Sequence, residues 1–165
     1  MPIKGFKPPL QRNSKYTQGR YVPINPTKYV GDIDNILYRS FYELVFMKWC
    51  DKNQSVLKWG SEDFNIQYVS PFDKKVHRYY PDFIIKVVLN NGQERIQIIE
   101  IKPNIQTKPP VMTTKKKTKR FLMEEATYLL NTSKWDAAKL FADSHNMDFI
   151  LIDEYDLGIK KRPKD

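Results

Sequence analysis

Two short segments contain the residues that could do chemistry: Tyr80-Pro81-Asp82-Phe83 and Ile99-Glu100-Ile101-Lys102. They supply two carboxylates and an amine, each among apolar neighbours, where an ionised side chain needs compensation for its charge. Carboxylate and carbonyl oxygens are the ligands that Mg²⁺ prefers, and Mn²⁺ is expected to substitute. A bound ion of this kind acidifies a water and stabilises charge on a phosphate. The sequence therefore predicts a phosphodiester-hydrolysing site with Asp82, Glu100 and the Ile101 carbonyl on the metal and Lys102 as the catalytic amine.

The register of one β-hairpin decides whether these groups meet. Two strands are predicted, Tyr79–Leu89 and Arg95–Lys102, with an Asn-Asn-Gly-Gln turn between them. Side chains alternate along a strand, so Glu100 and Lys102 project to one face. Asp82 lies opposite Glu100 only if the loop has an odd length or the hairpin has a β-bulge, since a two-residue turn directs Asp82 to the other face. The alternative interpretation is a buried ion pair without catalysis.

The surrounding pattern predicts a mixed sheet flanked by helices, in the order α-β-β-β-α-α-β. The predicted strand Arg95–Lys102 is apolar on both faces and is expected to be central. All three tryptophans, Trp49, Trp59 and Trp135, fit core positions. The other predicted elements are a helix from Asp32 or Asp34 to about Asp51, a strand over Phe64–Val69, helices over Lys115–Leu130 and Ser133–Asn146 broken at Asn131-Thr132, and a strand over Phe149–Ile152.

Charge is segregated along the chain, whose net charge is +9 over 165 residues. Residues 1–31 and 101–123 contain no acid. Such segregation is typical of a protein that binds a polyanion, although a solvated surface is the alternative interpretation. We expect a basic, proline-containing arm that does not pack (1–31), a nuclease domain (32–157) and a basic tail (158–165). The basic residues expected to contact the phosphates of double-stranded DNA, with little sequence specificity, are Lys115, Lys116, Lys117, Lys119 and Arg120.

Several classes of protein are disfavoured by composition. Cys50 is the one cysteine, so no intrachain disulfide can form. No apolar run approaches the roughly 20 residues of a membrane span, and we expect an intracellular protein without a membrane. There is no glycine-rich phosphate loop, so we expect no nucleotide cofactor.

The segment Pro81-Asp82 followed by Glu100-Ile101-Lys102 resembles the PD-(D/E)xK nuclease superfamily, which implies a restriction-endonuclease-like core. Upstream, Tyr38-Arg39-Ser40-Phe41-Tyr42-Glu43 is similar to the Arg-Ser-x-x-Glu stretch of transposon-end-cutting nucleases in that superfamily. The helical glutamate of that stretch completes the metal site. The resemblance therefore implies Glu43 as a third acidic residue of the site.

A closer resemblance, to the head completion nucleases of tailed bacteriophages, rests on Tyr29-Val30-Gly31-Asp32, on Val76 to Asp82 and on Thr118-Lys119-Arg120. It implies a role in late capsid assembly and head–tail joining, trimming packaged or protruding DNA. The implied partners are proteins of the phage head and portal vertex. The implied location is the cytoplasm of the infected host, with retention at the head vertex of the virion as a further expectation.

Three residues outside the acidic pair are expected to contact DNA: Arg39, His77 and Arg78. For His77 and Arg78, a purely structural role in capping the end of a strand is an equally good interpretation. Two other functions stay open. One is a non-catalytic DNA-binding protein of the head vertex that retains the fold. The other is an endonuclease of transposition or restriction.

Overall fold

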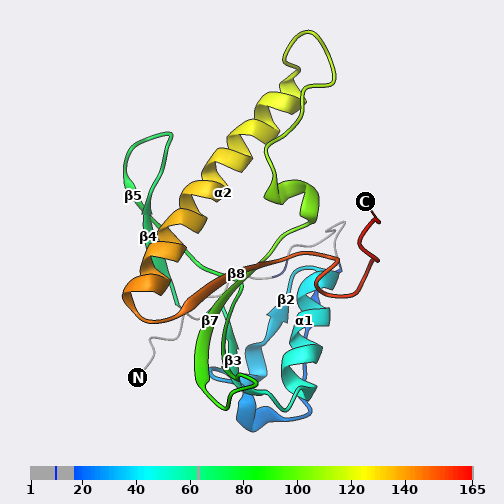
Figure 1. The fold of residues 1–165 in the computed structure, drawn as a ribbon, viewed down its shortest axis with the longest axis vertical. Coiled ribbons are helices and arrows are strands. Elements are labelled where there is room, and N and C mark those ends of the chain that lie inside the picture. The colour runs from blue at the N-terminus through cyan, green and yellow to red at the C-terminus, as the bar shows by residue number, and fades with distance from the viewer. Residues whose placement is uncertain (1–9, 11–16, 63, 165) are drawn as a thin grey trace.

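A four-stranded mixed sheet forms the centre of the molecule in the computed structural model, which describes residues 10, 17–62 and 64–164 (Figure 1). Its strands, in spatial order, are β3 (Val56–Ser61), β6 (Phe83–Val88), β7 (Glu94–Ile101) and β8 (Asp148–Ile152). Strand β6 is antiparallel to both β3 and β7, and β8 runs parallel to β7. The predicted central strand is therefore confirmed, because β7 has a neighbour on each side.

Each face of the sheet is covered by one long helix (Figure 1). Helix α1 (Phe41–Lys52) packs Phe46 and Met47 into one core, which also contains Ile99. On the other face, Ile98 shares a second core with helix α2 (Lys119–Ser144) and with a separate two-stranded sheet, β4 (Ile66–Val69) and β5 (Val76–Tyr79). This arrangement confirms the predicted mixed α/β, restriction-endonuclease-like fold.

The β6–β7 hairpin has the register that the site needs. Phe83 pairs with Ile99 and the pairing continues without a shift to the end of the hairpin. Leu89 donates its N–H to Gln93 at 2.8 Å, which closes a three-residue loop, and Gly92 in that loop has a φ of 80°. A glycine adopts this left-handed conformation without strain. The loop has an odd length, so continuing the register sets Asp82 opposite Glu100.

Helix α1 begins later than the sequence suggested. Asp32 caps only a short 3-10 helix, η2 (Ile33–Asn35), and the chain then forms β2 (Leu37–Tyr38), which pairs with β1 (Gly19–Arg20). Ser40 is the true N-cap, because its side chain accepts the N–H of Glu43. The prediction of a helix from Asp32 or Asp34 is therefore wrong. A serine three residues before a glutamate is the stronger start signal.

The described part of the N-terminal region packs against α1, contrary to the prediction of an unpacked arm. Tyr21 and Tyr29 are buried in the first core. Lys28, at the end of 3-10 helix η1 (Pro26–Lys28), donates to the carbonyls of the last turn of α1. A cation at this position offsets the negative end of the helix dipole. Residues 1–9 and 11–16 of the predicted arm lie outside the described residues.

Helix α2 is continuous where a break was predicted. Thr132 and Ser133 donate their side-chain hydroxyls to the carbonyl of Leu129, so their polar groups are satisfied inside the helix. Farther along, Trp135, Ala138 and Ala142 are buried and hold the second half against the sheet. Packing therefore outweighs the local tendency of the polar residues to end the helix. The helix begins at Lys119, four residues after the predicted start at about Lys115, and Thr118 is its N-cap.

The strands before the site differ from the predicted ones in two ways. Strand β3 was not predicted; its pairing with β6 shifts between Val56 and Lys58, which interrupts the alternation of its side chains. The predicted strand from Tyr79 is divided, since Pro81 separates β5 from β6 and has no N–H for a ladder. After β7 the chain forms 3-10 helix η3 (Asn104–Thr107). Among the described residues, no helix has the length and apolarity to cross a bilayer.

Candidate active site

Asp82 and Glu100 lie next to each other at one end of the central hairpin, on adjacent strands. Asp82 directly precedes β6, and its Oδ2 accepts the backbone N–H of Ile101 at 2.7 Å. Glu100 is the penultimate residue of β7 and is only 4% exposed. Among the described residues, no hydrogen bond reaches the Oδ1 of Asp82. The pair therefore presents a carboxylate oxygen that the protein itself does not satisfy.

Two side chains fix the orientation of the Glu100 carboxylate. The Nζ of Lys102 lies 2.9 Å from Oε1. The hydroxyl of Tyr79, at the end of β5, donates to Oε2 at 2.5 Å. Lys102 follows β7 directly, and its backbone N–H donates to Ile152 of β8. The predicted trio of Asp82, Glu100 and Lys102 is therefore brought together by one hairpin and its neighbouring strand.

The pKa values of Asp82 and Lys102 are both raised in this trio. Burial, followed by the neighbouring charge of Glu100, raises the pKa of Asp82 well above its ordinary value. For Lys102, burial alone would lower the pKa, but the carboxylates of Asp82, Glu100 and Glu43 outweigh burial and raise it. One ammonium does not offset the negative charge of the site. A divalent cation would supply the compensation that is missing.

Glu43 lies close enough to act on the trio but is engaged elsewhere. Its Oε2 accepts the backbone N–H of Arg39 at 2.7 Å, and its Oε1 accepts the hydroxyl of Ser40 at 3.3 Å. Burial raises the pKa of Glu43, and its charge contributes to the shifted pKa values of Asp82 and Lys102. Both oxygens cap the start of α1. Within the described ranges, no three His, Cys, Asp or Glu side chains are spaced to hold one metal ion.

The other residues predicted to contact DNA are Arg39, His77 and Arg78, and each has a different environment. The backbone N–H of Arg39 donates to Glu43, but the Arg39 side chain forms an ion pair with Glu62, with Nε 3.1 Å from Oε1. His77 and Arg78 are exposed on β5, and His77 Nε2 lies 2.8 Å from the carboxylate of Asp73. The hairpin of β4 and β5 presents these two residues to solvent. Their contact with DNA stays a prediction.

The basic segment lies away from the trio. Lys115 to Arg120 are all exposed, and they form the loop before α2 and its first turn, which project beyond the sheet (Figure 1). Lys117 forms an ion pair with Glu125, and Arg120 forms one with Glu124. Exposed pairs of this kind contribute little to stability and exchange readily with other anions. The segment can therefore bind phosphates at a distance from the acidic residues.

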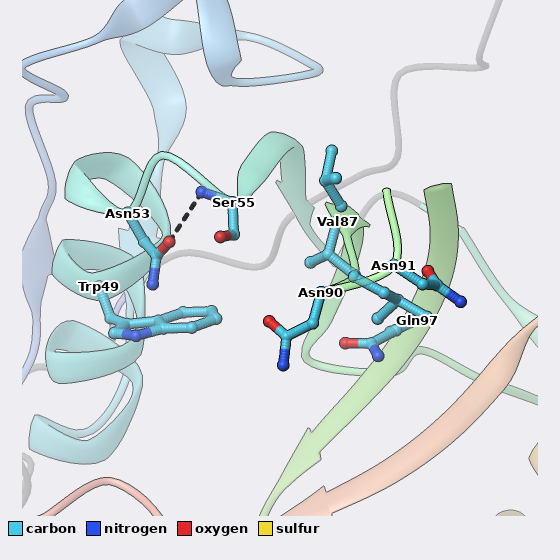
Figure 2. Close-up of a pocket in the computed structure, with 9 residues that line it drawn as sticks. Trp49, Asn53, Ser55, Val87, Asn90, Asn91 and Gln97 are labelled. Carbon is cyan, nitrogen blue, oxygen red and sulfur yellow. Dashed lines mark hydrogen bonds between the residues drawn. The ribbon is translucent and has the colours of Figure 1, made fainter. Parts of the chain in front are cut away.

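A hollow at the opposite end of the hairpin contains no acid or base. Figure 2 shows Trp49, Asn53 and Ser55 facing Asn90 and Gln97 across it. Trp49 is 45% exposed and stacks on Phe46 with ring centres 5.5 Å apart, so its prediction as a core residue is wrong. Trp59 and Trp135 are buried, as predicted. Its polar lining consists of amides, the Ser55 hydroxyl and the Trp49 indole, so it lacks a side chain that acts as an acid or base near neutral pH.

Tyr79 contacts the candidate site and was missed by sequence reasoning. It was assigned to the strand that contains Asp82, where a tyrosine is ordinary. The signal was available, because the proline two residues later divides that strand and frees Tyr79 to approach from another sheet. Its link to Glu100 is a contact between separate strands, and no spacing rule reports such a contact.

Comparison with known proteins agrees with this geometry. A family model described as the N-terminal domain of TnsA-like endonucleases matches residues 53–154. The chain belongs to the TnsA-like endonuclease family. The matched range contains Asp82, Glu100 and Lys102 but begins after Glu43. The chain is also similar to the head completion nuclease of Enterobacteria phage T4, with 41% identity over 140 residues, which are 82% of this chain and 90% of that protein. The fold and the family of this chain are therefore those of a nuclease.

Proposed function

We propose that this TnsA-like nuclease hydrolyses DNA phosphodiesters with a Mg²⁺ ion held by Asp82, Glu100 and the carbonyl of Ile101. The observation that carries the proposal is the pair of adjacent carboxylates with one lysine, because they leave negative charge uncompensated. Oxygen donors of this type suit a hard divalent cation. When bound, Mg²⁺ supplies an acidified water and offsets the charge of the reacting phosphate.

The protein side chains orient the reactants. Lys102 is held at Glu100, and the surrounding carboxylates keep its pKa raised, so the amine is a cation at neutral pH. It acts as a hydrogen-bond donor that positions the attacking oxygen and neutralises the phosphate in the transition state. Tyr79 keeps the Glu100 carboxylate in one orientation. Glu43 adds negative charge from the start of α1, which its carboxylate also caps. Its direct ligation of the metal, which the family resemblance implies, stays a prediction.

Double-stranded DNA is the proposed substrate, held largely through its phosphates. The exposed basic segment before α2 and the first turn of that helix carry no acid that would repel DNA. Lysines at a helix start oppose the helix dipole, so their placement is not explained by helix stability. Phosphate contacts carry no sequence information. We therefore expect little sequence specificity.

The proposed biological role follows the similarity to the T4 protein, whose name describes a head completion nuclease. In this role the enzyme trims packaged or protruding DNA before head–tail joining. Its partners are proteins of the phage head and portal vertex. It acts in the cytoplasm of the infected host and stays at the head vertex of the virion.

The proposal is tested with supercoiled plasmid, with Mg²⁺ or with EDTA. Wild type should convert plasmid to nicked or linear DNA only with Mg²⁺, and Asp82→Asn should not. Glu94→Gln is the matched control, because Glu94 is an exposed acid at the other end of the same hairpin, paired with Lys86. Cleavage by Asp82→Asn at the wild-type rate would overturn the site. Tight DNA binding by wild type without any cleavage would favour the non-catalytic vertex protein instead.

A further inference from the structure

A second amine lies near the acidic residues, on a different element from the one that leads to Lys102. Lys134 lies in the middle of α2, and its Nζ is 5.8 Å from the ring centre of Tyr68 and 5.9 Å from that of Tyr79. Tyr79 is the residue that donates to Glu100. Lys134 therefore reaches the site from the helix that covers this face of the sheet.

The ammonium of Lys134 is not satisfied by the protein. Within the part of the chain that the structure describes, it has no carboxylate within ion-pair distance and no hydrogen-bond acceptor, only the two aromatic faces. An ammonium has three N–H donors. Lys134 is half-buried, and burial lowers its pKa, while Glu100 opposes that shift. A cation with open donors and reduced hydration has a high tendency to bind an anion.

The charge balance of the site indicates which anion. The carboxylates of Glu43, Asp82 and Glu100 exceed the ammoniums of Lys102 and Lys134 by one negative charge. A divalent cation would reverse this to one positive charge. That excess matches the single negative charge of a phosphodiester.

We propose that Lys134 binds a non-bridging oxygen of the substrate phosphate in this site, an inference that rests on the proposed function. The rings of Tyr68 and Tyr79 hold the ammonium by cation–π contacts and leave its N–H groups for the phosphate. Lys102 and Lys134 then approach the phosphate from two elements, the end of β7 and the middle of α2. The alternative is a brace, in which Lys134 only keeps Tyr79 in place.

Binding of a short DNA duplex distinguishes the two roles. Lys134→Met keeps an unbranched side chain against the rings but removes the charge, and Lys139→Met is the matched control at an exposed lysine of the same helix. Affinity is measured as a function of NaCl with Ca²⁺ in place of Mg²⁺, because Ca²⁺ has the same charge and also takes oxygen ligands, and a gel of each sample checks that the duplex stays intact. Each phosphate contact contributes about 0.9 to the log–log salt slope. Lys134→Met should lower the slope by about 0.9, Lys139→Met should leave it unchanged, and Lys134→Arg should keep it.

Thermal unfolding completes the comparison, because loss of a residue that only keeps Tyr79 in place would lower the melting temperature. A lower melting temperature for Lys134→Met with an unchanged salt slope would overturn the proposal and leave only the brace. An equal fall of the slope in Lys139→Met would overturn it too, because the effect would be general charge loss. Wild-type cleavage in Mg²⁺ is measured separately. Its absence would count against the proposed function, whereas the binding comparison reports on Lys134 in either case.

Discussion

Two aspartates of this protein, Asp51, which is buried, and Asp82, which is partly buried, are held in opposite ways. Asp51, at the end of α1, is 0% exposed and accepts the hydroxyl of Tyr21 and the backbone N–H groups of Ile24 and Asn25. Burial would raise its pKa, but these donors outweigh burial and hold the pKa below its usual range. Asp82 accepts one N–H and faces another carboxylate, and its pKa is raised.

The difference is the one expected between a structural acid and an acid of the proposed active site. Donors around Asp51 come from a segment that must pack, so its charge fixes the N-terminal region onto α1. Asp82 has few donors and a like charge beside it, an arrangement that costs stability. Such a cost is typical of functional sites, where charge is left for a ligand to compensate. Aspartate is thus satisfied by donors at Asp51 and left with few donors at Asp82.

The largest expected effect is on catalysis. Glu100→Gln should lower DNA cleavage by about a thousandfold or more, because removing a preorganised electrostatic group of an active site costs rate on the order of 10²–10³ and the metal is lost as well. Thermal stability without metal should stay the same or rise, since a repelling charge is removed. Initial rates on plasmid and a melting curve test both statements. A rate within tenfold of wild type would contradict them.

The same substitution at the structural acid should have the reverse result. Asp51→Asn keeps the shape but replaces one acceptor oxygen by an NH₂ donor, which would face either Tyr21 and the Ile24 N–H at the position of Oδ2 or the Asn25 N–H at the position of Oδ1. Charged hydrogen bonds of this kind contribute about 1.5–3 kcal/mol each, so we expect a loss of about 2–4 kcal/mol. Urea unfolding measures it. Cleavage per folded molecule should be close to wild type, and a thousandfold loss there would break the comparison.

The pH dependence of stability sharpens the contrast. Because the pKa of Asp51 is lowered on folding, its contribution is present above its unfolded pKa of about 4 and is lost as the pH falls through the folded value. Asp82 has the opposite sign, so its cost grows as the pH rises above about 4. Melting curves in EDTA should show Asp82→Asn gaining more at pH 7 than at pH 4. Equal gains at both values would contradict the raised pKa.

The smallest expected effect on cleavage is that of substitutions in the basic segment. Changing Lys115, Lys116, Lys117 and Lys119 to Gln should lower the log–log salt slope of duplex binding by up to about 3–4, because up to four phosphate contacts are lost. Cleavage of saturating DNA should change little, since the segment lies away from Glu100. Fluorescence anisotropy over a salt series provides the slope. If the slope is unchanged, the segment is a solvated loop and DNA is held elsewhere.

The site was more predictable than its supports. Local alternation placed Glu100 and Lys102 on one face, and the register set Asp82 opposite Glu100. The start of α1 was missed because Asp32 competes with Ser40 as a cap, and only the pairing of β1 with β2 decides between them. Contacts distant in sequence were the least predictable. The link from Tyr79 to Glu100 and the packing of Tyr21 on Asp51 both depend on tertiary structure.

The most direct test of the contrast between the two acids is stabilisation by Mn²⁺ in the absence of DNA. Thermal unfolding is followed over a Mn²⁺ titration for wild type, Asp82→Asn and Asp51→Asn. A ligand at a hundred times its Kd adds about 2.7 kcal/mol to the stability of the state it binds. We predict that Mn²⁺ adds the same increment to wild type and Asp51→Asn and little to Asp82→Asn. An equal increment in Asp82→Asn would contradict a metal site at Asp82 and Glu100.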